Sequence, residues 1–122
     1  MEKVLTVVIP SFNVEKYLRQ TLESLRNEEI LEDVEVLIVD DGSTDGTAKI
    51  GKEYEKRYPQ TYRVISKTNG GHGSTINCGI EQSRGTFFKV VDGDDWVNTE
   101  ALIEVVRRLK TCGAELCGDR LL

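Results

Sequence analysis

Carboxylate side chains gather at two places in this sequence, and each group directly follows a hydrophobic run. Asp40–Asp41 follow the run Val36–Val39, and the stretch Asp92–Asp95 follows the run Phe87–Val91. Two carboxylates on a tight turn, such as Asp92-Gly93-Asp94, suit a hard divalent cation. Because such a cation usually completes its coordination shell with phosphate oxygens, these residues point to a nucleoside diphosphate as the ligand.

A simple turn or helix cap is the alternative for Asp92–Asp95, since Asp and Gly favour both. Three carboxylates within four residues repel one another, however, and a bound cation would offset that repulsion. An EF-hand calcium loop is excluded because Trp96 occupies the place of the third loop ligand. We therefore expect a cation and a phosphate at this turn, and we expect Trp96 to form core or a pocket wall.

Asp41 is the second candidate for ligand binding. It comes at the end of a predicted strand, and no basic residue adjoins it in the sequence. The alternative is an ordinary strand-to-helix connection in which an Asp or Ser side chain caps the helix. We predict that the Asp41 carboxylate accepts hydrogen bonds from a base or ribose.

The apolar pattern predicts the elements that position these residues. Strands are predicted at residues 4–9, 34–39, 62–65 and 87–91, with a further strand at Ala114–Cys117. Helices are predicted at 14–25, from Ser43 or Asp45 to about Tyr58, at 74–83 and at 100–110. This alternation predicts an α/β fold, Rossmann-like, with a mostly parallel sheet and helices on both faces. Ligands bind beyond the carboxyl ends of such strands, so both acidic clusters are expected at one site.

Turn residues predict where the helices begin and end. Asn13 is the expected cap of the first helix, Ser43 or Asp45 of the second and Thr99 of the last. Gly85 is expected to separate the third helix from the last strand.

A glycine-rich loop, Asn69–Gly73, precedes the third predicted helix. Its glycines permit close approach of a ligand to the backbone, but the loop lacks the lysine of a P-loop. His72 is the single histidine of the chain, and a lone loop histidine is more often exposed to solvent than catalytic.

Composition narrows the class of protein. The 122 residues, 39% hydrophobic and 30% charged, fit one soluble domain spanning residues 1–122. A net charge of −5 argues against a general nucleic-acid binder. Three widely spaced cysteines suit reduced thiols rather than disulfides, and no apolar run is long enough for a membrane span. These features, with no signal peptide, predict a cytoplasmic protein.

Four motifs in order resemble those of family 2 glycosyltransferases: Val8–Asn13, Val39–Thr47, Asn69–Gly71 and Val91–Asp95. The resemblance covers nearly the whole chain. It implies a GT-A fold and inverting transfer of a sugar from a UDP- or GDP-sugar to a carbohydrate or lipid-linked acceptor. It also implies Mn²⁺ or Mg²⁺ as cofactor, and a full-length protein that works in the cytoplasm or at the inner face of the membrane.

By matching position, the resemblance implies roles for individual residues. Pro10 and Phe12 would border the base, and Asp41 would hydrogen-bond to it. Asp92 and Asp94 would be the Asp-x-Asp pair that holds the metal, with Asp94 as the main ligand. The implied nucleotide-sugar site comprises Pro10, Phe12, Asp41, Asn69, Gly70 and Asp92.

The sequence departs from the family pattern in two respects. Family members often carry an Arg before the residue that matches Asn77, where this chain has Ile76. The general base is expected in an acceptor-binding half, and Asp119 follows the Asp-x-Asp pair too closely to match it. The chain is therefore expected to be the nucleotide-binding half of a longer enzyme. By itself this half is expected to fold, to self-associate through exposed apolar surface and to transfer sugar slowly at most.

Two other functions remain open from the sequence. One is a non-catalytic nucleotide-binding module, which the missing base favours. The other is a phosphatase-like hydrolase with Asp92 as nucleophile, which the hydrophobic run before Asp92 favours and the absence of a later acidic pair opposes.

Overall fold

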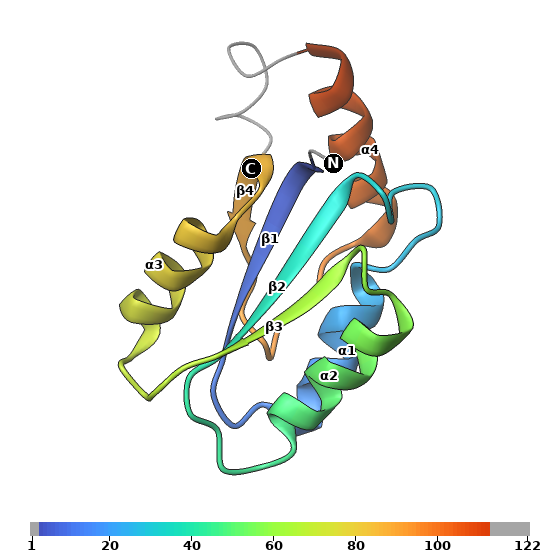
Figure 1. Cartoon of the computed structure of the whole chain (residues 1–122). Coiled ribbons are helices and arrows are strands. Elements are labelled where there is room, and N and C mark those ends of the chain that lie inside the picture. Colours follow the sequence, from blue (N-terminus) through green and yellow to red (C-terminus); the bar gives the residue numbers. More distant parts are fainter. Residues whose placement is uncertain (1–2, 113–122) are drawn as a thin grey trace.

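The computed structural model describes residues 3–112, and within them strands and helices alternate along the chain (Figure 1). The strands are β1 (Lys3–Ser11), β2 (Val34–Asp40), β3 (Tyr62–Ser66) and β4 (Gly85–Val90). The helices are α1 (Glu15–Ser24), α2 (Thr47–Arg57), α3 (His72–Gln82) and α4 (Thr99–Cys112). The strand predicted at Ala114–Cys117 lies outside the described residues. No helix of the described part combines the length and apolar character that a membrane crossing requires.

The strands form one parallel sheet in the order β3-β2-β1-β4. The chain first builds outward from β1 to β3 and then returns to place β4 on the other side of β1. Where the connections that leave two adjacent strands run in opposite directions, a crevice forms at the carboxyl ends of these strands. Ligands of α/β proteins bind in this crevice. The predicted α/β fold is confirmed, and its topology places this crevice between the ends of β1 and β4.

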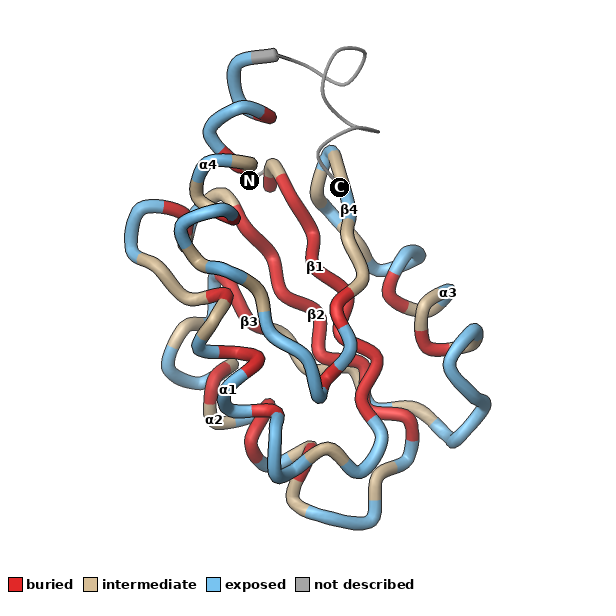
Figure 2. The backbone as a smooth tube through the Cα atoms, turned by 180° about the vertical axis from the view of Figure 1, so that it is seen from behind, coloured by how far each residue is buried: buried red, intermediate tan, exposed pale blue. Residues whose placement is uncertain are grey.

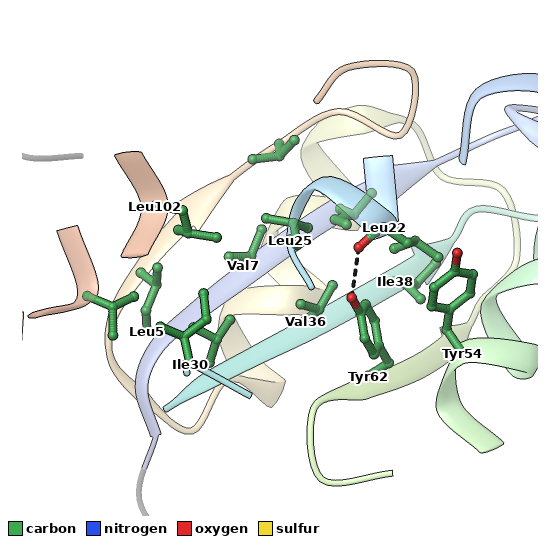
Figure 3. Close-up of a cluster of buried hydrophobic side chains, with 14 of the residues drawn as sticks. Leu5, Val7, Leu22, Leu25, Ile30, Val36, Ile38, Tyr54, Tyr62 and Leu102 are labelled. Atoms are coloured by element: carbon green, nitrogen blue, oxygen red, sulfur yellow. Dashed lines mark hydrogen bonds between the residues drawn. The ribbon is translucent and has the colours of Figure 1, made fainter. Parts of the chain in front are cut away.

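Both faces of the sheet carry helices. Figure 2 shows that β1 and β2 are buried along most of their length. Leu5, Val7 and Ile9 of β1 belong to a buried apolar cluster with side chains of α1, α2 and α4 (Figure 3). Tyr62 closes one side of this cluster and donates a hydrogen bond to the Leu22 carbonyl at 2.7 Å (Figure 3). Since alternate strand residues face opposite ways, Val8 points to the other face.

Helix α3 covers that second face, as Figure 1 shows. Its approach is close at Gly79, where a Cβ atom would lie 2.4 Å from Cγ1 of Val8. No side chain larger than hydrogen fits there, so Gly79 sets the helix-to-sheet distance. α3 consequently brings its first residues to the carboxyl end of β1.

One carboxylate caps two helices: Asp45 caps α2 locally, as predicted, and also caps α1 from the neighbouring loop. Asn13 does not cap α1; it has a positive φ of 52°, and its Oδ1 accepts a hydrogen bond from Thr44 N at 2.8 Å. Asp45 instead accepts from Glu15 N at 3.2 Å with one oxygen and from Thr47 N at 2.9 Å with the other. The loops after β1 and β2 lie side by side because the two strands are parallel neighbours. One carboxylate can therefore serve the N-termini of both helices.

Four other local predictions need correction. The side chain that caps α4 is Asn98, whose Oδ1 accepts from Ala101 N at 3.0 Å, whereas the Thr99 hydroxyl donates to Ser24. Gly85 belongs to β4, because it pairs with β1 across the sheet. Trp96 is 59% exposed and neither belongs to the core nor lines the cleft, because it follows an acidic turn on the surface. α3 begins two residues earlier than predicted, at His72, because the glycine-rich loop ends at Gly71.

A buried carboxylate links the strands on the α3 face. Glu35, only 1% exposed, accepts hydrogen bonds from Thr6 Oγ1 at 3.1 Å, from Arg84 N at 2.9 Å and from Arg84 Nε at 2.7 Å. Burial alone would raise the pKa of Glu35, but the hydrogen bonds from Arg84 and Thr6 outweigh it and hold the pKa below its ordinary value. Glu35 therefore joins β2, β1 and the residue that precedes β4.

We expect Glu35→Gln to lower the free energy of unfolding by about 2 kcal/mol, because a charged acceptor of three hydrogen bonds is lost. Since the folded-state pKa of Glu35 lies below the unfolded value, its stabilisation is present above about pH 4.5 and is lost as pH falls through the folded value. Urea titrations at pH 7 and pH 3 should show a difference between parent and variant that shrinks at pH 3. An equal difference at both pH values would contradict this.

Candidate functional site

A cleft of about 500 Å³ opens at the carboxyl ends of β1, β2 and β4. All the predicted site residues except Gly70 line it, and the backbone N–H of Gly70 donates a hydrogen bond to Asp41, which does. The fold thus brings residues from four separate sequence motifs together in this cleft. Their roles in binding stay predictions. The lining residues are Pro10, Ser11, Phe12, Val14, Asp41, Asn69, Gly71, His72, Thr75, Asp92, Gly93 and Asp94.

Pro10 and Phe12 form an apolar wall at the end of β1. In the parallel register Pro10 lies opposite Val39 and Ser11 opposite Asp40, so this wall stands directly beside Asp41. Phe12 follows the last residue of β1, and about half of its surface is exposed. An exposed aromatic face next to a carboxylate offers a surface for a flat heterocycle whose edge carries hydrogen-bond donors.

Asp41 is buried at the back of the cleft and is held by three hydrogen bonds. Its Oδ1 accepts from Lys67 Nζ at 3.0 Å and from Gly70 N at 2.8 Å, and its Oδ2 accepts from Gly71 N at 3.0 Å. Burial would raise the pKa of Asp41, but these bonds outweigh it and hold the pKa below its ordinary value. Asp41 is therefore charged at neutral pH.

The partners of Asp41 revise the sequence interpretation. No basic residue adjoins Asp41 in the sequence, yet the loop after β3 brings Lys67 to it. A carboxylate offers about four acceptor positions, of which three are used here. Asp41 thus fixes the loop Lys67–Gly71 and retains room for about one more donor from a ligand.

The three carboxylates of the acidic turn after β4 differ in what they face. Asp92 and Asp94 line the cleft, whereas Asp95 Oδ1 accepts a hydrogen bond from Trp96 N at 2.8 Å within the turn. Asp95 N donates to the Asp92 carbonyl at 3.0 Å, which closes the turn. Two carboxylates, rather than three, therefore face a ligand.

His72 is the cleft residue that sequence reasoning underrated. It is 62% exposed at its side chain, as expected of a loop histidine, but its Nε2 lies 2.9 Å from Oδ1 of Asp92. The signal lay in its place directly after Gly70-Gly71 and at the start of a helix, where it reaches the carboxyl edge of the sheet. His72 joins the glycine-rich loop to the acidic turn.

The donor set of the cleft fits a hard cation held jointly with a ligand. Within residues 3–112, no group of three or more His, Cys, Asp or Glu side chains is arranged to hold a metal alone. Asp92 and Asp94 supply two carboxylates that open to the cleft. Mg²⁺ and similar ions bind through one or two carboxylates together with phosphates of the substrate. The site therefore has the ligands for a metal–diphosphate complex and lacks those of a structural zinc site.

Sequence comparison with known proteins points to one family. The sequence profile of Glycosyl transferase family 2 matches residues 6–120. EpsH of Bacillus subtilis strain 168 is 37% identical over 102 residues, which cover 84% of this chain and 29% of EpsH. TarS of Staphylococcus aureus strain Mu50, a poly(ribitol-phosphate) beta-N-acetylglucosaminyltransferase, is 35% identical over 98 residues, covering 80% of this chain and 17% of TarS.

Solved structures agree with the fold. The crystal structure of S. aureus TarS 1-349 in complex with UDP-GlcNAc has a TM-score of 0.78 and 34% identity, covering 88% of this chain and 31% of that chain. A mannosyltransferase from Pyrobaculum calidifontis, solved with GDP-Man and Mn²⁺, has a TM-score of 0.76 at 22% identity and supports the fold alone. The chain spans between 17% and 34% of the length of these proteins.

Proposed function

Because this chain belongs to glycosyltransferase family 2, we propose that it is the donor-binding part of an inverting glycosyltransferase, with the GT-A arrangement of a parallel sheet. The observation that carries the proposal is the cleft between β1 and β4. It combines a buried carboxylate at its back with two exposed carboxylates on the neighbouring turn. A nucleoside-diphosphate sugar needs both a polar site for its base and a site for a metal–diphosphate complex.

The proposed donor is a UDP-sugar. TarS, at 34% identity, was solved with UDP-GlcNAc, and this chain has side chains that suit a uracil base. The exposed ring of Phe12 and the neighbouring Pro10 would cover one face of the base, and the remaining acceptor position of Asp41 would take a hydrogen bond from its edge. The acceptor would be a carbohydrate or a lipid-linked compound with a free hydroxyl group.

The proposed reaction displaces a nucleoside diphosphate from the anomeric carbon of the sugar. When bound, a Mn²⁺ or Mg²⁺ ion supplies Lewis-acid stabilisation for the charge on the leaving diphosphate. Asp94, with Asp92, would hold this ion, and His72 would keep the Asp92 carboxylate oriented. We assign the general base, which takes the proton of the acceptor hydroxyl, to residues other than those that line this cleft.

The test is calorimetric titration of the chain with UDP, in buffer with Mn²⁺ and in buffer with EDTA. We expect UDP to bind and its affinity to rise at least about tenfold with Mn²⁺, a difference of about 1.4 kcal/mol. Uridine, which lacks the diphosphate, should show no such gain. GDP is the matched control for the base.

Failure of every nucleoside diphosphate to bind would overturn the proposed function. Tighter binding of GDP than of UDP would overturn the base assignment while leaving donor binding intact. A UDP affinity that is the same with Mn²⁺ and EDTA would overturn the metal assignment.

A further inference from the structure

A buried hydroxyl on α1, which does not line the cleft, contacts the acidic turn. Thr21 is completely buried, and its Oγ1 lies 3.0 Å from the Gly93 carbonyl and in hydrogen-bond contact with the Asp95 carbonyl. These two carbonyls belong to the residues immediately before and after Asp94. One hydroxyl therefore contacts the backbone on both sides of the proposed principal metal ligand.

This contact is more than the usual bond of a helical threonine. A threonine inside a helix commonly donates to the carbonyl four residues earlier. Here that carbonyl belongs to Tyr17 and lies 3.3 Å away, farther than the carbonyl of Gly93. Since the hydroxyl has one proton to donate, the shorter contacts favour the acidic turn over the helix.

Packing holds the same turn from its other sides. Gly93 N donates to the Pro10 carbonyl at 3.2 Å. A Cβ atom on Gly93 would lie 2.8 Å from Cγ2 of Val14 and 3.1 Å from Oγ of Ser11. The backbone at Gly93 is thus wedged between the end of β1 and the start of α1, and the Asp94 side chain is left facing the cleft.

A second hydroxyl on α1 provides a natural comparison. Ser24 lies three residues after Thr21, and its Oγ accepts a hydrogen bond from Val97 N at 3.1 Å. Its carbonyl accepts from the Thr99 hydroxyl at 2.8 Å. Ser24 therefore fixes the segment that leads into α4, after the acidic turn has ended.

We infer that Thr21 is a positioning residue for the metal site. Its single hydroxyl proton is shared between the carbonyls of Gly93 and Asp95, which flank Asp94. This contact holds the turn so that the Asp94 carboxylate already faces the cleft before the ion and the diphosphate arrive. A ligand held in its bound geometry spares the cost of ordering it on binding. Partners outside the coordination shell commonly change metal affinity by about 10–100-fold. This inference rests on the proposed function, because it concerns how the proposed site is shaped.

The experiment compares Thr21→Val with Thr21→Ser and Ser24→Ala. Valine keeps the shape and a helix propensity similar to that of threonine but cannot donate a hydrogen bond. Serine keeps the hydroxyl. Each protein is titrated with UDP in Mn²⁺ and in EDTA, and Mn²⁺ release is followed by electron paramagnetic resonance in the presence of UDP.

We expect Thr21→Val to lose about tenfold of the Mn²⁺-dependent gain, with the affinity in EDTA unchanged. Thr21→Ser should restore the gain, and Ser24→Ala should retain it despite its own loss of a loop contact. If Thr21→Val does not fold, Thr21→Ala, which leaves room for water at the two carbonyls, takes its place. A full Mn²⁺ gain in the folded variant that lacks the hydroxyl would overturn the inference and leave the proposed function standing. A parent chain that binds no UDP would overturn both.

Discussion

Asp94→Ala is expected to abolish the Mn²⁺-dependent part of UDP affinity and to leave the affinity measured in EDTA unchanged. Asp94 opens into the cleft beside Asp92, and a single remaining carboxylate would have to share the ion with the diphosphate. Loss of a residue that hydrogen-bonds to a metal ligand lowers metal affinity by roughly 10–100-fold. Loss of the ligand itself should lower the affinity by at least the upper part of this range. Paired calorimetric titrations of parent and variant would measure the difference.

Asp95→Ala is the matched control for this measurement. Asp95 is one residue away and carries the same charge, but its carboxylate accepts a hydrogen bond from Trp96 N and does not line the cleft. The control should keep the Mn²⁺ gain and show only the small change that loss of one turn contact brings. UDP binding by Asp94→Ala as tight as that of the parent in the same Mn²⁺ buffer would show that the metal assignment is wrong.

Asp41→Ala is expected both to destabilise the chain and to weaken UDP binding. The side chains of Asp41 and Lys67 are 6% and 19% exposed, so removal of the carboxylate leaves a largely buried ammonium group without its partner. Breaking such a pair costs about 3–5 kcal/mol, and the partial exposure of Lys67 favours the lower end. Separately, loss of a hydrogen bond between the ligand and a charged group should weaken UDP binding by about 1.5–3 kcal/mol, which is roughly 10–100-fold in affinity.

Asp41→Asn separates the two effects. The amide keeps the size and one acceptor oxygen for the loop, so we expect a smaller loss of stability than in Asp41→Ala. The folded-state pKa of Asp41 lies below its ordinary value of 3.8, so its charge stabilises the chain above about pH 4. That contribution is lost as pH falls through the folded pKa, and the Asn variant should lack this dependence. Unchanged stability and unchanged UDP affinity in Asp41→Ala would reduce Asp41 to an ordinary turn residue.

The strands could be predicted from the sequence because each is marked by a local apolar run. The location of the cleft followed from these runs and from one rule of topology. Val36–Val39 and Phe87–Val91 are apolar enough to be recognised as buried strands. Parallel strands place their following residues at one edge, and that was sufficient to bring Asp41 and Asp92 together. The length of each run, rather than any long-range information, determined these predictions.

The partners of the same residues could not be predicted, because they come from distant parts of the chain. Lys67 reaches Asp41 through a loop that follows a different strand. Thr21 lies within the helix predicted at residues 14–25, and it is buried. Its hydroxyl, however, bonds to a turn more than 70 residues later, at a sequence separation of 72 from Gly93. Spacing on a helix shows which face is buried but not which backbone carbonyls that face will meet.

The sheet order has a consequence for how this chain acquires its shape during synthesis. β1 is made before the other described strands, but its pairing with β4 joins Val8 to Val90 and must wait until β4 has been synthesised. At about 5–20 residues per second, that delay is roughly 4–16 s, during which β1, β2 and β3 are available to assemble first. Such distant pairings also form slowly because a long loop must close before any contact rewards it. The two walls of the cleft therefore meet late in folding, and an early intermediate lacking β4 would expose the edge of β1 and lack the carboxylates of Asp92 and Asp94.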